Sequence, residues 1–441
     1  MLAKTTAYII ICEDKDVKEK LVIMNKEQLL QGILDCECGE SHVCPIDYVV
    51  IKHDALKDLK ELCEGYLSIL MVSDQNTYRI CGKEVADILG EKITISVRFE
   101  TGDAALIPNE DAIKAIHSKV VDGVDLVLGV GSGVINDLCK IVSFECKLPY
   151  YIVATAPSMD GYASVGSALI LKGMKVTLNA APPKAIVADT KILKESPLEM
   201  IRAGYGDILG KYSCLNDWKL SALINEEYFC QFVYDLTYET ADRVRTLAEG
   251  IVNRDEDAVG ALMDALVVVG ISMAYVGNSR PASGSEHHFS HYFEITGILT
   301  DTPYFAHGID VAYAAVLTAK IRETILSSTP IRREFDEEKW KSEVARIYLS
   351  SADEVIELQK KMGWYWEDNS EKVIPKWDEI KELLAKAPTE TEMLEMLEAV
   401  GMNYQEFIDL YGQAKIDDGV LYAKDLKDRY SVLWLYYEFF R

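Results

Sequence analysis

The sequence predicts an α/β fold made of a doubly wound parallel sheet followed by an all-α domain. Short apolar runs of strand length alternate with amphipathic helical segments in the first half of the chain. After Glu195, long helical patterns replace them, with no second series of strands. The length of 441 residues also exceeds one typical core. We therefore expect a Rossmann-like domain over residues 1–195 and a helical domain over residues 196–441.

The composition is that of a globular protein with a large acidic excess. Apolar residues make up 49% and charged residues 27% of the chain, which fits neither disorder nor a fibrous repeat. The 71 acidic and 46 basic residues give a net charge of −25. A field of this sign repels phosphate backbones and anionic lipid surfaces. We expect neither nucleic acid nor a membrane as partner, and any phosphorylated ligand needs a local cation.

The first residues lack the pattern of a targeting sequence. Ala7–Cys12 is apolar, but Glu13 and Asp14 follow at once, without a cleavage site of small residues. The chain has no uninterrupted apolar run of about 20 residues. Its ten cysteines are too few for a disulfide scaffold at this length. We expect a cytoplasmic protein with reduced thiols.

Five apolar runs are the predicted strands of the sheet. They are Tyr48–Lys52, Tyr66–Ser73, Ile93–Phe99, Val124–Gly129 and Tyr150–Ala154. Segments with helical spacing, such as Thr77–Leu89 and Asp111–Val121, lie between them and favour parallel pairing. Farther on, two runs that flank Lys172-Gly173-Met174 predict a hairpin, which we place at the edge of the sheet.

The predicted helical domain starts at a clear signal. Ser196-Pro197-Leu198-Glu199 is a capping box with proline at the first helical position. Amphipathic patterns then cover Glu239–Val252, Asp257–Tyr275, Val311–Ser327 and Trp340–Met362. The aromatic-rich end, Leu433–Arg441, is expected to dock on these helices.

A glycine-rich loop follows the fourth predicted strand. The strand runs into Gly129-Val130-Gly131-Ser132-Gly133, and a helix begins near Val134. Glycines let backbone N–H groups approach a pyrophosphate, whose charge the helix N-terminus favours. The spacing is neither G-x-G-x-x-G nor a Walker sequence. We interpret it as a phosphate loop, with a plain strand-to-helix turn as the alternative.

Two other strand ends carry polar side chains. Asp74 follows Leu67–Val72 and is placed to accept hydrogen bonds from an adenosine ribose, which favours NAD. A helix-capping role fits Asp74 equally well. The segment Thr155–Ser164 follows the fifth predicted strand and carries hydroxyls together with Asp160. Loops at this end of an open sheet line the ligand crevice, although a hydroxyl-rich turn is the alternative.

The histidines are distributed unevenly. Of seven in the chain, four lie within 21 residues: His287, His288, His291 and His307. His287 and His291 are four residues apart and share a helix face, whereas His288 points about 100° away. Such a pair commonly binds a metal, and His307 could complete the site. Core histidines or a surface cluster are the alternatives.

Two further groups have both a functional and a structural interpretation. Asp207 in Ala203-Gly204-Tyr205-Gly206-Asp207 could balance the charge of a metal or simply cap a helix. The cluster of Cys36, Cys38, His42 and Cys44 offers zinc ligands. Its Cys-x-Cys spacing is unlike the usual pairs, so we favour a surface turn with thiols.

Five motifs occur in order along the chain: GVGSGVIND (Gly129–Asp137), TAPSMDGYAS (Thr155–Ser164), AGYGD (Ala203–Asp207), SRPASGSEHHFSH (Ser279–His291) and AHGID (Ala306–Asp310). Together they resemble the sn-glycerol-1-phosphate dehydrogenases, in the bacterial AraM-like branch. That family belongs to the superfamily of iron-containing alcohol dehydrogenases and dehydroquinate synthases. The resemblance spans Ile46 to Ala319, and the tail after it is compatible with the family.

The resemblance implies a role for each matching residue. The cofactor, NAD(H) with NADP(H) as the alternative, is expected at Asp74, Gly131, Gly133, Val134, Ile135, Asn136 and Asp137, and along Thr155, Ala156, Pro157, Ser158 and Ser164. One divalent metal, zinc, nickel or iron, is expected on Asp207, His287 and His307. Asp160, Asp207 and His291 are the implied substrate-binding and catalytic residues. His291 thereby faces the substrate, not the metal, which replaces the pairing of His287 with His291.

The implied reaction is the reversible reduction of dihydroxyacetone phosphate to sn-glycerol 1-phosphate. The metal polarises the C2 oxygen, the nicotinamide gives hydride, and His291 or a metal-linked water gives the proton. Arg280 and Lys211 are the candidates for binding the phosphate. We expect a homodimer or larger homo-oligomer, to which the tail after Glu323 could contribute.

Three rival functions remain open at this point. A glycerol dehydrogenase would act on unphosphorylated polyols with the same metal ligands. A lyase similar to dehydroquinate synthase would use NAD transiently, but such sites usually have glutamate as the first ligand and several more lysines. A binding protein without turnover would bind NADH, but it would not oxidise NADH with any triose phosphate.

Overall fold

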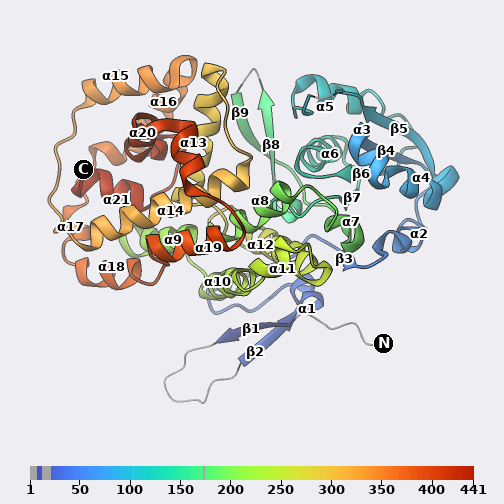
Figure 1. Cartoon of the computed structure of the whole chain (residues 1–441), viewed down its shortest axis with the longest axis horizontal. Helices are drawn as coiled ribbons and strands as arrows, with labels where there is room; N and C mark the ends of the chain where they lie inside the picture. Colours follow the sequence, from blue (N-terminus) through green and yellow to red (C-terminus); the bar gives the residue numbers. More distant parts are fainter. Residues whose placement is uncertain (1–6, 12–20, 103, 172–173) are drawn as a thin grey trace. The chain divides into compact units, whose positions relative to one another are not determined.

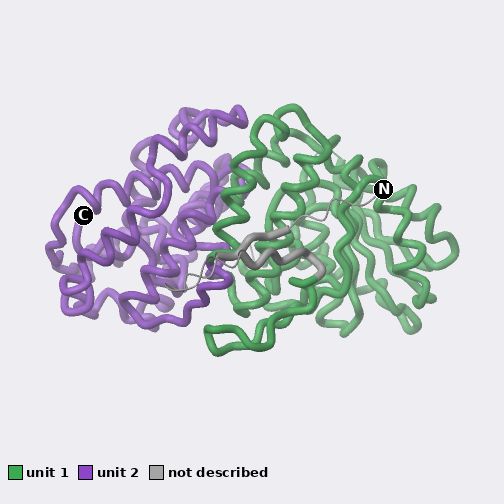
Figure 2. The backbone as a smooth tube through the Cα atoms, turned by 90° about the horizontal axis from the view of Figure 1, so that it is seen from below, with its two compact units in different colours: residues 1–208, 235–279 green, residues 209–234, 280–441 purple. Residues whose placement is uncertain are grey.

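The structure is a computed structural model of the whole chain (Figure 1), and it describes residues 7–11, 21–102, 104–171 and 174–441. The chain divides into two compact units (Figure 2). Unit 1 comprises residues 1–208 and 235–279, and unit 2 comprises residues 209–234 and 280–441. The chain therefore passes between the units after residues 208, 234 and 279. The predicted boundary between residues 195 and 196 falls inside unit 1.

Unit 1 is built on a six-stranded sheet in which every neighbouring pair is parallel. The order is β3 (Tyr48–Lys52), β10 (Ala185–Asp189), β7 (Tyr150–Ala154), β6 (Leu126–Gly131), β4 (Ile69–Asp74) and β5 (Ile93–Phe99). The predicted doubly wound sheet is thus confirmed. Three of the predicted strands have the predicted bounds.

The central strands are apolar on both faces, which allows both faces of the sheet to be covered. All residues of β6, β7 and β10 are buried, as expected for strands of a parallel sheet. The sequence pattern did not predict β10, whose five residues follow shortly after the hairpin in the chain. In the structure β10 lies between β3 and β7.

The predicted hairpin is present as β8 (Gly166–Leu171) and β9 (Met174–Asn179), which pair in antiparallel fashion. Its turn, residues 172–173, lies outside the described residues. The expected place at the sheet edge is wrong, because β8 and β9 form a sheet of their own in the described part of the chain, and β3 and β5 are the edges of the large sheet. Another antiparallel pair, β1 (Ala7–Ile11) with β2 (Leu21–Asn25), precedes it in the chain.

Helices complete unit 1. Those named below are α1 (Lys26–Gln31), α3 (Gln75–Thr77), α5 (Glu110–His117), α6 (Gly133–Cys146), α8 (Leu198–Leu209), α10 (Gln231–Arg245) and α12 (Glu256–Val276). By length and apolar composition α12 could cross a membrane, but most of it is buried in the structure. It therefore has the surroundings of a core helix.

The secondary-structure elements of unit 2 are all helices in its described residues, and loops join them. This confirms the predicted helical C-terminal region. Its elements include α9 (Lys211–Asn225), α13 (Ser285–Thr300), α14 (His307–Leu326), α15 (Glu337–Tyr348), α16 (Ala352–Met362), α20 (Tyr404–Tyr422) and α21 (Val432–Phe439). The aromatic end of the chain is buried as expected, since Trp434 is fully shielded from solvent.

Candidate active site

The strand order places the predicted cofactor residues at one point of the sheet. From β4 the chain continues outward to β5, whereas from β6 it continues in the other direction to β7 and β10. β4 and β6 are direct neighbours, with Ser73 opposite Val130. Asp74 and Gly131, which end these strands, therefore lie at the topological switch point, where open α/β sheets bind ligands at the carboxyl ends of their strands.

The glycine-rich loop joins β6 to α6 in a tight turn. A Cβ atom on Gly131 would lie 2.6 Å from the Ile135 side chain, so this position requires glycine. Ser132 is the N-cap of α6, but its side chain makes no capping hydrogen bond. The loop therefore leads into the N-terminus of α6, whose backbone N–H groups could bind a pyrophosphate.

Asp74 has the structural role that the sequence left open. Its Oδ1 accepts hydrogen bonds from the backbone N–H groups of Asn76 at 2.7 Å and Thr77 at 2.9 Å. Asp74 thus caps α3 in a reciprocal capping box with Thr77. A hydrogen bond from the adenosine ribose to Asp74 stays a prediction, in addition to this capping role.

The segment Thr155–Ser164 is held against α6 by a lysine that the sequence reading missed. Lys140 is fully buried, and its Nζ donates to the Gly161 carbonyl at 2.8 Å and to Ser164 Oγ at 3.1 Å. Asn136 Nδ2 also donates to the Gly161 carbonyl, at 3.2 Å. Desolvation lowers the pKa of Lys140, while nearby Asp137 acts in the opposite direction. Lys140 therefore positions the loop that carries Asp160.

Two of the sequence motifs meet in unit 1. Asp207 on α8 is fully buried, and its Oδ2 accepts a hydrogen bond from the backbone N–H of Asp160 at 2.9 Å. Gly204, one helical turn earlier, allows this approach. A Cβ atom there would lie 1.9 Å from the Pro157 carbonyl oxygen. The AGYGD and TAPSMDGYAS motifs thus hold Asp207 beside the loop of Asp160.

We expect Gly204→Ala to destabilise unit 1. The added methyl group cannot be accommodated without moving α8 away from Pro157, because the obstacle is backbone. The free energy of unfolding should fall by about 3 kcal/mol or more. Urea unfolding measures this, and Gly133→Ala is the control, since a Cβ at Gly133 meets Met159 only at an ordinary 3.6 Å. Equal stability of the two variants would contradict the contact.

Three of the four clustered histidines come together in unit 2. The ring centroids of His287 and His307 are 5.0 Å apart, and His291 lies 6.2 Å from His287 and 5.7 Å from His307. His287 and His291 lie on α13, and His307 begins α14. The two helices pack against each other. The predicted association of these three histidines is therefore present within unit 2.

Neighbouring side chains hold Nδ1 of both the His287 and the His307 ring. His287 Nδ1 lies 2.6 Å from Glu286 Oε1, a carboxylate oxygen, and so donates to it. Ser290 Oγ donates to the His307 carbonyl at 3.4 Å and lies 3.1 Å from His307 Nδ1. Nδ1 of His287 is thus the donor and its Nε2 keeps the lone pair, while Ser290 holds Nδ1 of His307. Imidazoles that bind metals are oriented in this way, and sequence reasoning missed Glu286 and Ser290.

His288 is excluded from this cluster, as its position on the helix predicted. It is fully buried, and neither ring nitrogen has a hydrogen-bond partner among the residues that the structure describes. Desolvation, and then the positive charges of Arg429, Lys427 and Arg280, hold the pKa of His288 well below its ordinary value. His288 is therefore a neutral core residue.

The two candidate phosphate-binding cations are buried in unit 2. Arg280 forms an ion pair with Glu227 and donates to the Tyr430 carbonyl at 2.9 Å. Lys211 Nζ donates to the Ala282 carbonyl at 3.0 Å. Arg429 donates to the next carbonyl, that of Ser283, at 2.9 Å. Cations therefore gather on the segment that leads into α13.

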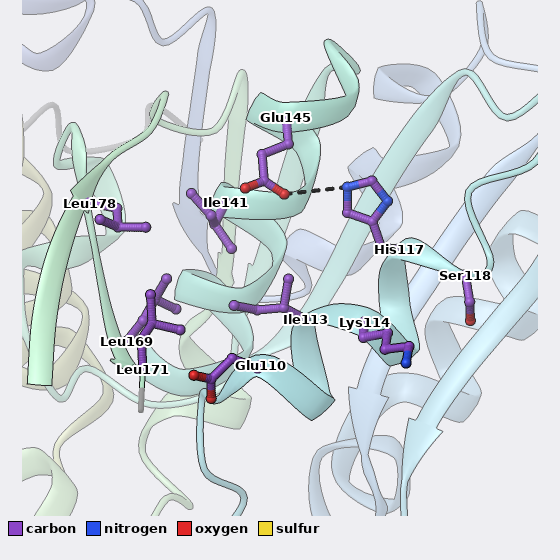
Figure 3. A pocket seen from close by; sticks show the side chains of 10 residues that line it. All are labelled: Glu110, Ile113, Lys114, His117, Ser118, Ile141, Glu145, Leu169, Leu171 and Leu178. Atoms are coloured by element: carbon purple, nitrogen blue, oxygen red, sulfur yellow. Dashed lines mark ion pairs between the residues drawn. The ribbon is translucent and has the colours of Figure 1, made fainter. Parts of the chain in front are cut away.

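A pocket on unit 1 is separate from these residues (Figure 3). It lies among α5, α6 and the β8–β9 hairpin, and His117 pairs with Glu145 at 3.3 Å on its rim. Its lining consists of Glu110, Ile113, Lys114, His117, Ser118, Ile141, Glu145, Leu169, Leu171 and Leu178. No residue predicted for cofactor, substrate or metal lines it.

Known proteins are similar to this chain over most of its length. A family model for iron-containing alcohol dehydrogenases matches residues 50–197. A glycerol-1-phosphate dehydrogenase (NAD(P)+) of Halalkalibacterium halodurans is 34% identical over 293 residues, which is 65% of this chain and 73% of the relative. Another, of Geobacillus thermodenitrificans, is 33% identical over 332 residues, 73% of this chain and 82% of the relative.

Solved structures share the fold. A probable glycerol dehydrogenase from Sinorhizobium meliloti aligns with a TM-score of 0.57 at 15% identity, over 86% of this chain and 89% of that one. At this identity the likeness concerns the fold alone. The identity to the two glycerol-1-phosphate dehydrogenases extends over most of their length, so the chain belongs to the glycerol-1-phosphate dehydrogenase family of the iron-containing alcohol dehydrogenases.

Proposed function

We propose that the protein catalyses the reversible, NAD(P)H-dependent reduction of dihydroxyacetone phosphate to sn-glycerol 1-phosphate. The observation that carries the proposal is the pair His287 and His307, whose Nδ1 atoms are held by Glu286 and Ser290. Two imidazoles held in this way, that of His287 buried and that of His307 half-buried, suit a divalent metal. The names of the two relatives supply the substrate and the cofactor of the proposal.

The metal is proposed to bind Asp207, His287 and His307. Each of these residues offers one ligand atom, and the donor set of two imidazoles and one carboxylate accepts zinc, nickel or iron. A site with three protein ligands leaves a position for the substrate, as catalytic sites require. We propose that residues 196–441 bind the metal and the substrate, while residues 1–195 bind the cofactor. The protein is proposed to work in the cytoplasm.

The cofactor is proposed to lie across the switch point of the sheet. The amide end of α6 with Gly131 and Gly133 would hold the pyrophosphate, and Asp74 would face the ribose. The loop from Thr155 to Ser164, which Lys140 positions, would line the nicotinamide side.

The roles of the side chains follow from their surroundings. When bound, the cofactor supplies a hydride and the metal acts as a Lewis acid on the C2 oxygen of the substrate. His291, third in the histidine cluster, would deliver the proton to that oxygen and remove it in the reverse direction. Asp207 would hold the loop of Asp160, and with it the substrate, through the hydrogen bond to the Asp160 N–H.

The phosphate of the substrate needs a cation in a protein of charge −25. Lys211 and Arg280 are proposed for this role because both are buried beside the segment that leads into α13. Lys211, which follows Asp207 by four residues in the chain, is the first candidate to test.

The deciding experiment is an NADH-oxidation assay with dihydroxyacetone phosphate. The protein is stripped of metal with a chelator and then assayed with added Zn²⁺, Ni²⁺ or Fe²⁺. We expect turnover only after metal addition and a product that is the 1-phosphate enantiomer. Equal or greater efficiency with dihydroxyacetone, or the 3-phosphate product, would contradict the proposal.

A side chain at Gly133 should weaken cofactor binding. A Cβ atom there meets Met159 only at an ordinary 3.6 Å, and the methyl groups of a valine would fill the space that a pyrophosphate needs near the backbone. We expect Gly133→Val to raise the Kd for NADH by roughly tenfold or more, about 1.4 kcal/mol, with unchanged metal content. Fluorescence titration of NADH measures this, and an unchanged Kd would refute the phosphate loop.

A further inference from the structure

A second group of metal-binding side chains lies in unit 1, apart from the histidines of the proposed active site. The thiol sulfurs of Cys36 and Cys38 and a ring nitrogen of His42 lie within 4.8 Å of one another. Cys38 Sγ is 3.4 Å from His42 Nε2. Cys44, which the sequence suggested as the fourth member, is not part of the group. The Cys-x-Cys pair and the histidine thus converge although Cys44 does not.

The backbone of this segment folds into a closed loop. Ile33 and His42 form a bridge, in which each backbone N–H donates to the carbonyl of the other, at 2.8 and 2.7 Å. Gly32 permits the close approach, because a Cβ there would lie 2.4 Å from the His42 carbonyl oxygen. At the tip, the Gly39 N–H donates to the Cys36 carbonyl at 2.9 Å. The loop therefore turns both cysteines back toward His42.

His42 is oriented as a metal-binding histidine is. It is fully buried, its ring stacks on Tyr275 of α12, and its Nδ1 lies 3.0 Å from the Tyr275 carbonyl oxygen. A carbonyl can only accept, so Nδ1 carries the proton and Nε2 keeps the lone pair. That lone pair is on the nitrogen that faces Cys38. Two thiols therefore lie near an imidazole nitrogen whose lone pair suits a metal.

The spacing also fits a zinc ion. In a tetrahedral site with Zn–S of 2.3 Å and Zn–N of 2.0–2.1 Å, sulfur and nitrogen lie roughly 3.6 Å apart. The observed separation of 3.4 Å between Cys38 and His42 is close to this value. The donor set of two sulfurs and one nitrogen is soft, which favours zinc over magnesium or calcium.

We propose that Cys36, Cys38 and His42 bind a structural zinc ion, with a fourth ligand other than Cys44. Binding exchanges two thiol protons, which pass to solvent, for one Zn²⁺, so the charge of the two thiolates is balanced. The site would fix the loop from Gly32 to Pro45, which leads into the edge strand β3, to α12 through the His42–Tyr275 contact. It is independent of the metal proposed for catalysis.

Metal analysis in a protein without the catalytic metal tests this proposal. His287→Ala with His307→Ala removes the proposed catalytic ligands, and zinc is then measured by mass spectrometry after dialysis. We expect about one zinc per chain to remain in this background and to be lost when Cys36→Ser and Cys38→Ser are added. Cys44→Ser is the matched control in the same loop and should retain the zinc.

Cobalt provides a second measurement that does not depend on the folding of the cysteine variants. With Co²⁺ in place of zinc, the His287→Ala/His307→Ala protein should show thiolate-to-cobalt charge-transfer absorption in the near ultraviolet, from at least two thiolates. Absence of this absorption while both cysteines are intact would overturn the proposal. Equal zinc content with and without Cys36 and Cys38, or loss of zinc in Cys44→Ser alone, would overturn it as well.

Discussion

Replacing His287 with alanine is expected to remove the catalytic metal and nearly all activity together. The variant loses one of two imidazoles whose orientation Glu286 and Ser290 have fixed, so the remaining ligands bind a metal weakly. We expect kcat/KM for dihydroxyacetone phosphate to fall by roughly a thousandfold or more, about 4 kcal/mol of transition-state stabilisation. Metal content and initial rates on the same preparation measure both effects.

Two neighbouring histidines serve as controls for this prediction. His291→Ala should keep the metal but lose turnover by roughly 10²–10⁴-fold, the range of a lost proton donor. His288→Leu should keep both, because His288 is buried without a hydrogen-bond partner. Loss of metal in His291→Ala with retention in His307→Ala would instead restore the pairing of His287 with His291 as ligands.

Dihydroxyacetone phosphate is expected to be a far better substrate than dihydroxyacetone. Charge-assisted hydrogen bonds from buried cations to the phosphate should favour it by roughly two orders of magnitude in kcat/KM, about 3 kcal/mol. Lys211→Met should reduce this preference more than it reduces turnover of the unphosphorylated ketone. Steady-state kinetics with both ketones measures the ratio for the wild type and the variant.

The matched variant for the phosphate prediction is Lys211→Arg, which keeps the positive charge. It should retain more of the preference than Lys211→Met does, provided that the longer side chain is accommodated in the buried site. Equal efficiency of the wild type on the two ketones would favour a glycerol dehydrogenase. In that case the phosphate site proposed for Lys211 and Arg280 would be wrong.

The parallel sheet could be predicted because its central strands are short apolar runs and its edge strand Ile93–Phe99 alternates apolar and polar residues. Tyr48–Lys52, Ile93–Phe99 and Tyr150–Ala154 appear in the structure with the predicted bounds. β10 was missed because five residues directly after a hairpin carry no periodicity of their own. Its pairing with β3 and β7 depends on contacts far apart in the sequence, which a local pattern does not contain.

The histidine cluster was visible in the sequence, but its supporting contacts were not. Spacing alone favoured His287 and His291 as a pair on one helix face. The contacts that hold Nδ1 of the two rings come from Glu286, next to His287, and from Ser290, which reaches His307 on the following helix. Lys140 was missed for a similar reason, since nothing in α6 signals that its lysine is buried against the Gly161 carbonyl.

The way the chain alternates between the units also bears on its synthesis. Unit 1 is interrupted after residue 208 and resumes at residue 235, so α12 is synthesised after the rest of the unit up to residue 208. Gly270 of α12 packs on the loop of Asp160, where an added Cβ would lie 2.5 Å from that of Ala163. The ribosome needs roughly 4–14 s to travel from residue 208 to residue 279 at typical rates of ~5–20 residues per second. During that interval α12 does not yet cover the loop that carries Asp160. A chaperone that binds apolar segments can therefore bind to this loop.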